Sequence, residues 1–292
     1  MTKTKIAYLG PEGTVTHEAT KYLFASDSYE LIPYKLISEI CNATAERETE
    51  LSIIPIENTI DGSVNAHLDY WLHEVDLPIQ AEWTYPSVQN LIGTSSGKAD
   101  QPWSQVRNIV SIPVAIAQCQ NFLKANLPDV EFTHVSSTAE GVRLVKERND
   151  PSYAAIGTVL AAHKYDLELL ASNITDHHNN YTRFIAVGHS KPELPPTSAQ
   201  KTTILVTLPE DYPGALHQVL SAFAWRRINL TKIESRPTKK KLGSYFFYID
   251  VVGSIDSVLL PAAIQEIEAI GCLVRVLGSY PCYTYQIDNS EV

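Results

Sequence analysis

The sequence predicts an α/β protein with two α/β lobes, followed by a smaller ferredoxin-like domain of βαββαβ order. Before residue 190, five short apolar segments each lead through a polar loop into an amphipathic helix pattern, which is typical of parallel strands with crossover helices. A proline-rich stretch at 188–201 then separates two well-patterned regions. The second region follows the order strand, helix, strand, strand, helix, strand.

Each element of the first region is a strand-to-helix unit. The predicted pairs are strand 5–10 with a helix from about Val15, 51–58 with 64–75, 108–111 with 116–125, 131–135 with 138–147, and 153–157 with 158–165. The stretch from 85 to 103 differs and predicts a strand pair with a turn, where the chain crosses into the second lobe. It is expected to return near 170–184, which predicts a cleft between the lobes.

The second region predicts strands at 201–210, 228–237, 243–253 and 272–281, with helices at 213–227 and 257–270. Edge strands and an apolar face of such a domain commonly pair with a second copy. We therefore expect one domain at 1–190, a linker at 191–201 and a second domain at 202–284.

Composition excludes several classes of partner. With 33 acidic and 23 basic residues the formal charge is −10, which would repel nucleic acids and anionic membranes. The four cysteines form no C-x-x-C pair, so neither a zinc site nor a disulfide framework is expected. No run approaches the roughly 20 apolar residues of a spanning helix. A cytoplasmic protein with reduced thiols is expected.

The polar loops lie where strands end and helices begin, and these positions suit anions because helix N-termini carry unpaired N–H groups. A single loop can also be a plain helix cap, and Ser137 with Glu140 has the spacing of a capping box. The loops supply neutral donors beside one strong cation, Arg183, a set that favours a small carboxylate ligand. An ion pair of Arg183, for example with Asp176, is the alternative. The neutral donors are Thr14, Asn58, Ser111, Gln118, Ser136 and Thr182.

Motifs for cofactors are missing. The first strand is not followed by G-x-G-x-x-G, and there is no G-x-x-x-x-G-K-[ST], so nicotinamide and ATP are disfavoured. The run Asp176–Asn180 contains adjacent histidines, which diverge on extended backbone and rarely bind one metal ion together. No metal is expected.

Five motifs, "GPEGTVTHEA", "PIENTIDGSV", "AIAQCQNFL", "NNYTRF" and "GALHQVLSAFAWRRINLTKIESRP", together resemble the prephenate dehydratases in order and over nearly the whole chain. The similarity is to the monofunctional Bacillus type, with an ACT regulatory domain in the second region. The resemblance implies two lobes like those of a periplasmic binding protein. It also implies conversion of prephenate to phenylpyruvate with loss of CO2 and water in L-phenylalanine biosynthesis. Aromatisation drives that reaction, so no cofactor is required.

The resemblance implies a role for individual residues. Thr182 would donate a hydrogen bond to the departing hydroxyl, and Arg183 would hold a substrate carboxylate. Glu57 could act as an acid or pair with a cation. The remaining substrate-binding residues would be Asn58, Ser111, Gln118 and Thr14. The chain departs from the family at Val15, Thr16, Ile112 and Ser136, which weakens the peripheral assignments.

For the ACT domain, the resemblance implies feedback regulation by L-phenylalanine bound between subunits of a homodimer or homotetramer. Without the resemblance, "ESRP" predicts a strand end with a surface Glu234–Arg236 pair. The residues expected to bind the effector are Gly214, Ala215, Leu216, Asn229, Leu230, Glu234, Ser235 and Arg236.

Two other functions fit the same motifs. Arogenate dehydratase differs in its substrate by an amino group in place of the keto oxygen. A non-catalytic binding protein could close its two lobes on a carboxylate without chemistry, with the ACT domain reporting the amino-acid level.

Overall fold

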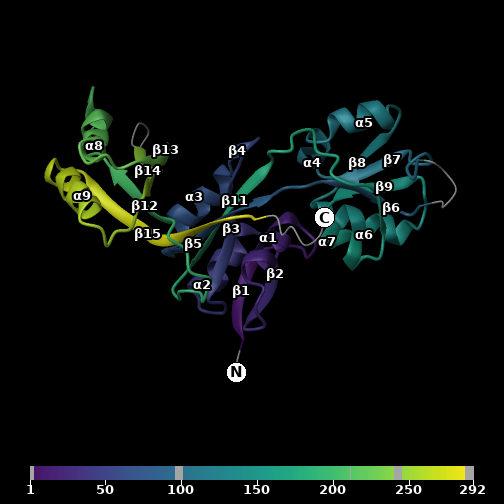
Figure 1. Cartoon of the computed structure of the whole chain (residues 1–292), viewed down its shortest axis with the longest axis horizontal. Coiled ribbons are helices and arrows are strands. Elements are labelled where there is room, and N and C mark those ends of the chain that lie inside the picture. The colour runs from purple at the N-terminus through teal and green to yellow at the C-terminus, as the bar shows by residue number, and fades with distance from the viewer. Residues whose placement is uncertain (1–2, 96–100, 211, 240–244, 287–292) are drawn as a thin grey trace. The chain divides into compact units, whose positions relative to one another are not determined.

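The computed structural model describes residues 3–95, 101–210, 212–239 and 245–286 (Figure 1). Contacts divide the chain into two compact units. The first contains Met1–Val75, Thr84–Phe184 and Tyr285–Val292, and the second contains Asp76–Trp83 and Ile185–Thr284. Strands β5 (Ile79–Pro86) and β11 (Tyr181–Gly188) therefore have residues in both units. The predicted boundaries at 190 and 202 stay predictions.

The first sheet of unit 1 has the strand order β11-β3-β1-β2, with β4 (Gly62–Ser63) paired to β3. Strand β1 (Thr4–Leu9) is parallel to both β2 (Tyr29–Tyr34) and β3 (Leu51–Asn58), as the crossover pattern predicts. Its helices are α1 (Val15–Leu23), α2 (Ile37–Ala45) and α3 (Asn65–Glu74). Neither β2 nor α2 is among the predicted elements. Strand β2 lies at the sheet edge and tolerates Pro33, so its sequence lacks the apolar run of a central strand.

The second sheet of unit 1 has the order β10-β6-β9-β7-β8. Strand β7 (Asn108–Ser111) is parallel to β8 (Glu131–His134) and β9 (Tyr153–Gly157), which confirms the predicted crossovers. Helices α6 (Thr138–Arg148) and α7 (Val159–Lys164) follow β8 and β9. The single helix expected at 116–125 is wrong: two short helices, α4 (Pro113–Ala117) and α5 (Gln120–Asn126), replace it.

The strand pair expected at 85–103 is also wrong in its described part. Strand β6 (Asn90–Gly93) pairs with β9 and with β10 (Glu168–Ala171), both antiparallel, and residues 101–105 form turns. Residues 96–100 of that prediction lie outside the described residues. The expected crossing is confirmed, since the chain leaves β5 for β6 of the second sheet and returns as β11 beside β3.

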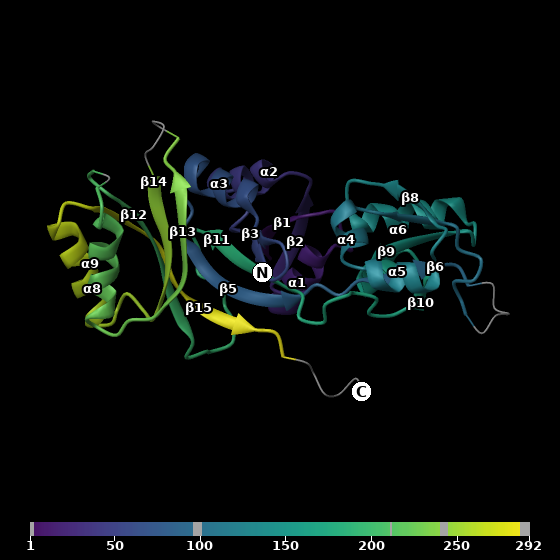
Figure 2. The same ribbon diagram turned by 90° about the horizontal axis from the view of Figure 1, so that it is seen from above.

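Unit 2 contains the predicted βαββαβ order. Its strands are β12 (Gln200–Thr207), β13 (Leu230–Pro237), β14 (Tyr245–Val252) and β15 (Leu273–Thr284), in the order β13-β14-β12-β15 with antiparallel pairs throughout. The start of the strand expected at 243–253 lies outside the described residues. Helices α8 (Ala215–Ala224) and α9 (Leu259–Ala269) lie side by side on one face of this sheet (Figure 2).

The core between these helices and the sheet is apolar, and includes Val219, Phe223, Ile249 and Ile267. Strand β15 pairs with β12 along one edge and with β5 along its other edge. The approach is close at Gly278, where an added Cβ would lie 2.5 Å from the carbonyl oxygen of Ile79. Among the described residues, no helix is long and apolar enough to cross a membrane.

Candidate active site

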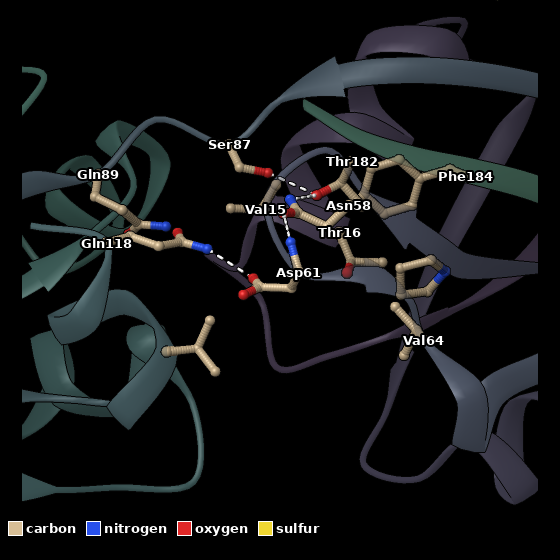
Figure 3. Close-up of a pocket in the computed structure, with 12 residues that line it drawn as sticks. Val15, Thr16, Asn58, Asp61, Val64, Ser87, Gln89, Gln118, Thr182 and Phe184 are labelled. Carbon is tan, nitrogen blue, oxygen red and sulfur yellow. Dashed lines mark hydrogen bonds between the residues drawn. The ribbon is translucent and has the colours of Figure 1, made fainter. Parts of the chain in front are cut away.

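A pocket of about 220 Å³ opens in unit 1 at the ends of strands from both of its sheets (Figure 3). That volume is small for a ligand site and suits a compact metabolite. Thr182 is the second residue of β11 and Asn58 is the last residue of β3, while Gln89 and Gln118 belong to the second lobe. The full lining is Val15, Thr16, Pro55, Asn58, Asp61, Val64, Ser87, Gln89, Val114, Gln118, Thr182 and Phe184.

The Thr182 hydroxyl lies between two partners. Its Oγ1 accepts a hydrogen bond from Asn58 Nδ2 at 3.1 Å and lies 2.7 Å from Ser87 Oγ. Figure 3 shows the Ser87 and Asn58 side chains converging on Thr182. The structure thus brings together the two motifs, "PIEN" and "TRF", on which the sequence prediction of the site depends.

Backbone groups fix the orientation of the Asn58 amide. Its Oδ1 accepts hydrogen bonds from the backbone N–H groups of Ile60 at 2.9 Å and Asp61 at 3.1 Å. Because only the oxygen of the amide can accept from these donors, the nitrogen must face Thr182. Asn58 Nδ2 also lies 2.8 Å from Asn180 Oδ1 and 3.2 Å from the Tyr181 carbonyl oxygen, so its two protons are shared among three acceptors.

The fixed orientation extends across the pocket through two further amides. Asn180, which is buried, donates through Nδ2 to Gln118 Oε1 at 3.0 Å and to the Ser87 carbonyl at 3.3 Å. The Gln118 oxygen is thereby directed to Asn180, and its Nε2 donates to Asp61 Oδ2 at 3.0 Å. This chain of amides joins residues of the two lobes and holds their polar groups in one arrangement.

Arg183 is not among the lining residues. Since side chains alternate along a strand, Arg183 lies on the opposite face of β11 from Thr182 and Phe184, which both line the pocket. Its Nη1 donates to Glu57 Oε2 at 3.1 Å, and its side chain is 10% exposed. The alternative of an ion pair is therefore realised, but the expected partner was wrong: Asp176 instead accepts from the backbone N–H of Asn121 at 2.9 Å.

Two other predicted donors have structural contacts away from the pocket. Thr14 is the N-cap of α1, where its Oγ1 accepts from the His17 N–H at 3.3 Å. The Ser111 hydroxyl is buried and donates to the Ile156 carbonyl at 2.8 Å. Neither residue lines the pocket: Thr14 is a helix cap and Ser111 is a buried hydrogen-bond donor, and substrate binding by either stays a prediction.

Half of the predicted capping box at Ser137 is present. The Ser137 hydroxyl accepts from the Glu140 N–H at 3.1 Å, but the Glu140 carboxylate accepts from the N–H and hydroxyl of Ser136 rather than from Ser137. These hydrogen bonds lower the pKa of Glu140. Ser136 therefore contributes to the start of α6 and does not line the pocket.

Sequence reasoning missed four polar residues of this site. Asp61 lies in the "TIDGS" loop, whose sequence is polar throughout and so singles out no residue, and Asn180 lies directly before "TRF". Ser87 and Gln89 follow β5 in a stretch that predicts strands, so nothing in their spacing marks them as site residues.

The predicted effector residues lie on two elements of unit 2. Gly214 has φ of 93°, in the left-handed region, and is followed directly by α8 with Ala215 and Leu216. On β13, the mostly buried Arg236 donates through Nη1 to Glu234 Oε1 at 3.1 Å, and Lys232 Nζ lies 3.4 Å from Glu234 Oε2. The Glu234–Arg236 pair is therefore present, but Arg236 is not at the surface. Effector binding by Gly214, Ala215, Leu216, Asn229, Leu230, Glu234, Ser235 and Arg236 stays a prediction.

No group of three or more His, Cys, Asp or Glu side chains that could hold a metal ion occurs within the described part of the chain. The three deeply buried thiols include Cys41 and Cys119, and burial raises the pKa of each to about 12. Neither thiol is therefore a nucleophile at neutral pH.

Comparison with known proteins gives two family matches. The prephenate dehydratase family model matches residues 6–192, and the ACT domain model matches residues 202–271. The prephenate dehydratase of Bacillus subtilis is 40% identical over 96% of this chain and 99% of its own length.

Two solved structures share this fold over most of the chain. The prephenate dehydratase of Arthrobacter aurescens, solved in complex with L-Phe, is 33% identical over 95% of this chain and 90% of its own, with a TM-score of 0.84. A protein described as a quorum-quenching acylase is 26% identical over 95% of this chain and 98% of its own, with a TM-score of 0.80. On the family match and the Bacillus relative, this chain belongs to the prephenate dehydratase family and ends in an ACT domain.

Proposed function

We propose that the protein is a prephenate dehydratase, which converts prephenate to phenylpyruvate, CO2 and water, and that L-phenylalanine inhibits it. The observation that carries this proposal is the Thr182 hydroxyl, held at the pocket by Asn58 and Ser87. The reaction needs a hydrogen-bond donor for a departing hydroxyl, and the lining offers one on a rigid strand.

The chemistry requires little beyond positioning and one donor. The bond between the ring and its carboxylate breaks, its electrons move through the diene, and the C–O bond to the ring hydroxyl breaks. The hydroxyl leaves as water with one proton that comes ultimately from solvent. Thr182 would stabilise the negative charge that develops on the leaving oxygen, which is the role of a hydrogen bond that strengthens in the transition state.

The charge of the pocket supports decarboxylation. None of its lining residues is Lys, Arg or His, and Asp61 carries a carboxylate. A cation beside the ring carboxylate would stabilise the charged substrate and so raise the barrier to loss of CO2. Neutral amides such as Gln118 and Gln89 can orient the carboxylates without this cost. The anchoring role of Arg183 stays a prediction, which would require its side chain to leave Glu57 and reach the pocket from the opposite face of β11.

One assay tests the enzyme proposal. Purified protein is incubated separately with prephenate and with arogenate, and formation of phenylpyruvate or phenylalanine is compared with the spontaneous rate. Faster turnover of prephenate supports the proposal, and faster turnover of arogenate would instead identify an arogenate dehydratase. No acceleration with either, together with binding of prephenate in calorimetry, would leave a non-catalytic binding protein.

Substitution of Thr182 tests the assigned role. Loss of the donor in Thr182→Ala should lower kcat about 100- to 1,000-fold, the usual effect of removing one donor to a developing oxyanion. Thr182→Ser keeps the hydroxyl and should retain a large part of the rate. A Thr182→Ala protein with wild-type kcat would show that another group assists the leaving hydroxyl.

The regulatory proposal is tested on the full chain. L-Phenylalanine should lower the initial rate, and Asn229→Ala should raise the concentration that is needed. Asn229 is exposed, so its truncation should leave folding intact. Val258→Ala, at an 87% exposed position outside the predicted effector residues, is the matched control and should be inhibited like wild type. Equal sensitivity in all three proteins would refute the placement of Asn229 in the effector site.

Two further assignments belong to this proposal. We propose a homodimer or homotetramer, which light scattering of the purified chain would measure, and a location in the cytoplasm. The acylase described above shares the fold at 26% identity, whereas the Bacillus prephenate dehydratase is 40% identical, which favours the dehydratase activity.

A further inference from the structure

The Ser87 hydroxyl contacts Thr182 at the pocket, and the proposed mechanism does not say in which direction that hydrogen bond runs. Ser87 follows β5, is 6% exposed and lies 2.7 Å from Thr182 through the two hydroxyl oxygens. Within the described part of the chain, this is the hydrogen bond that the Ser87 side chain makes. Either hydroxyl could be the donor, and the choice decides where the Thr182 proton points.

Ser87 is held in place by its own backbone. Its N–H donates to the Asn180 carbonyl at 2.8 Å, and its carbonyl accepts from Asn180 Nδ2 at 3.3 Å. Asn180 is itself fixed by Asn58 and Gln118. Ser87 therefore faces Thr182 as part of the same network that orients the pocket amides.

The accounting of donors and acceptors at Thr182 allows two arrangements, which differ in where the Thr182 proton points. A hydroxyl has one proton and two acceptor lone pairs. Asn58 Nδ2 occupies one lone pair, because its amide orientation is fixed by the N–H groups of Ile60 and Asp61. If Ser87 donates to the second, both acceptor positions of Thr182 are filled and its proton is left to point at the pocket. If Thr182 donated to Ser87, its proton would be used within the protein.

Accessibility favours the first arrangement. Both residues line the pocket, but Thr182 is half-buried and Ser87 is 6% exposed, so Thr182 is the more accessible hydroxyl for a ligand. We propose that Ser87 is a positioning residue, which donates its hydrogen bond to Thr182 Oγ1 and so directs the Thr182 proton toward the departing hydroxyl of the substrate. This inference rests on the proposed dehydratase function.

The test is a double-mutant cycle on the full-length protein, with kcat and KM for prephenate measured in wild type, Ser87→Ala, Thr182→Ala and the double variant. Ser87→Ala should lower kcat about 5- to 10-fold, the rate equivalent of one hydrogen bond, and leave KM within about twofold. In the Thr182→Ala background the same substitution should change kcat by less than about twofold, because Ser87 acts through Thr182.

Ser52→Ala is the matched control for loss of a buried hydroxyl. Ser52 lies on β3 in the same unit, is fully buried and shares a hydrogen bond with Thr44 Oγ1 at 2.6 Å, but it does not line the pocket. It should lower the melting temperature without a selective change in kcat at temperatures where the protein is folded. Ser87→Cys, with a weaker donor in nearly the same shape, should have a kcat between those of wild type and Ser87→Ala.

The outcomes separate this inference from the proposed function. Wild-type kcat in Ser87→Ala or Ser87→Cys would overturn the inference alone. An equal loss in both Thr182 backgrounds would also overturn it, because Ser87 would then act on the substrate directly or on the fold. A wild-type protein that does not accelerate the reaction of prephenate would overturn the proposed function and the inference together.

Discussion

A buried ion pair in unit 2 makes a quantitative prediction about stability. Lys201 Nζ on β12 lies 2.6 Å from Glu82 Oε1 on β5, and their side chains are 21% and 5% exposed. Glu82 Oε2 also accepts from the Tyr280 hydroxyl at 3.3 Å, and that hydroxyl lies 2.6 Å from Thr203 Oγ1. Lys201→Met would leave a nearly inaccessible carboxylate without its ammonium partner.

The expected cost of Lys201→Met is about 3 kcal/mol of unfolding free energy, the lower part of the range for breaking a buried pair. The hydroxyl of Tyr280 still donates to Glu82, which keeps the cost from being larger. Glu82→Leu should cost less, since the lysine it leaves is more exposed and can extend toward water. Combining Glu82→Leu with Lys201→Met removes both charges and should return stability to within about 1 kcal/mol of wild type.

The chain offers a matched exposed pair. Arg275 Nη2 lies 2.7 Å from Asp76 Oδ1, but these side chains are 46% and 92% exposed. Arg275→Met should cost about 0.5 kcal/mol or less. Urea unfolding followed by circular dichroism and tryptophan fluorescence measures all four variants. Equal costs for Lys201→Met and Arg275→Met, or a double variant less stable than Lys201→Met, would refute the argument from burial.

Three further outcomes follow from other sites. Burial lowers the pKa of His17 to about 4, so its folded-state pKa lies below its unfolded value near 6.5. Wild type should therefore lose stability as the pH falls from about 6.5 to 4. Melting curves of His17→Gln should lack this part of the pH dependence. Asp61→Asn removes a like charge from the pocket of a dianionic substrate and should lower KM about fivefold in steady-state kinetics, or ~1 kcal/mol. Gly278→Ala places a Cβ 2.5 Å from the Ile79 carbonyl oxygen and should cost about 2 kcal/mol or more in urea unfolding, whereas an unchanged midpoint would show that β15 can shift away.

The sequence predicted those elements whose pattern is complete within one segment. Strand β3 has the predicted bounds, and helix α1 begins at the predicted Val15, because an apolar run and a capping threonine define them locally. The prediction of one helix at 116–125 was wrong because the apolar periodicity continues across Gln118 and Cys119, whereas the backbone breaks there between α4 and α5. Tertiary contacts decide that break: the Gln118 carbonyl accepts from the Asp176 N–H at 2.7 Å.

The sequence predicted which polar residues lie near the pocket, but it did not predict which of their side chains point into it. Thr182, Asn58 and Gln118 meet at the pocket, as the convergence of strand ends implies. Arg183 and Ser111 have suitable side chains, but in the structure these side chains bind other partners. Successive residues of a strand face opposite sides of the sheet, so a shift of one residue decides whether a side chain faces the pocket. The sequence does not show where a loop ends and this alternation begins.

Strand β5 has a consequence for engineering, because residues 79–83 are built into the sheet of unit 2 beside β15. A chain cut near residue 190 to isolate the catalytic region would lose β15 and expose an open strand edge, with Ile79, Ala81 and Trp83 no longer fully covered. Such a fragment should aggregate. Exchange of regulatory domains between relatives would therefore succeed only if the donor's last strand fits this edge, so the ACT region is not a freely portable module.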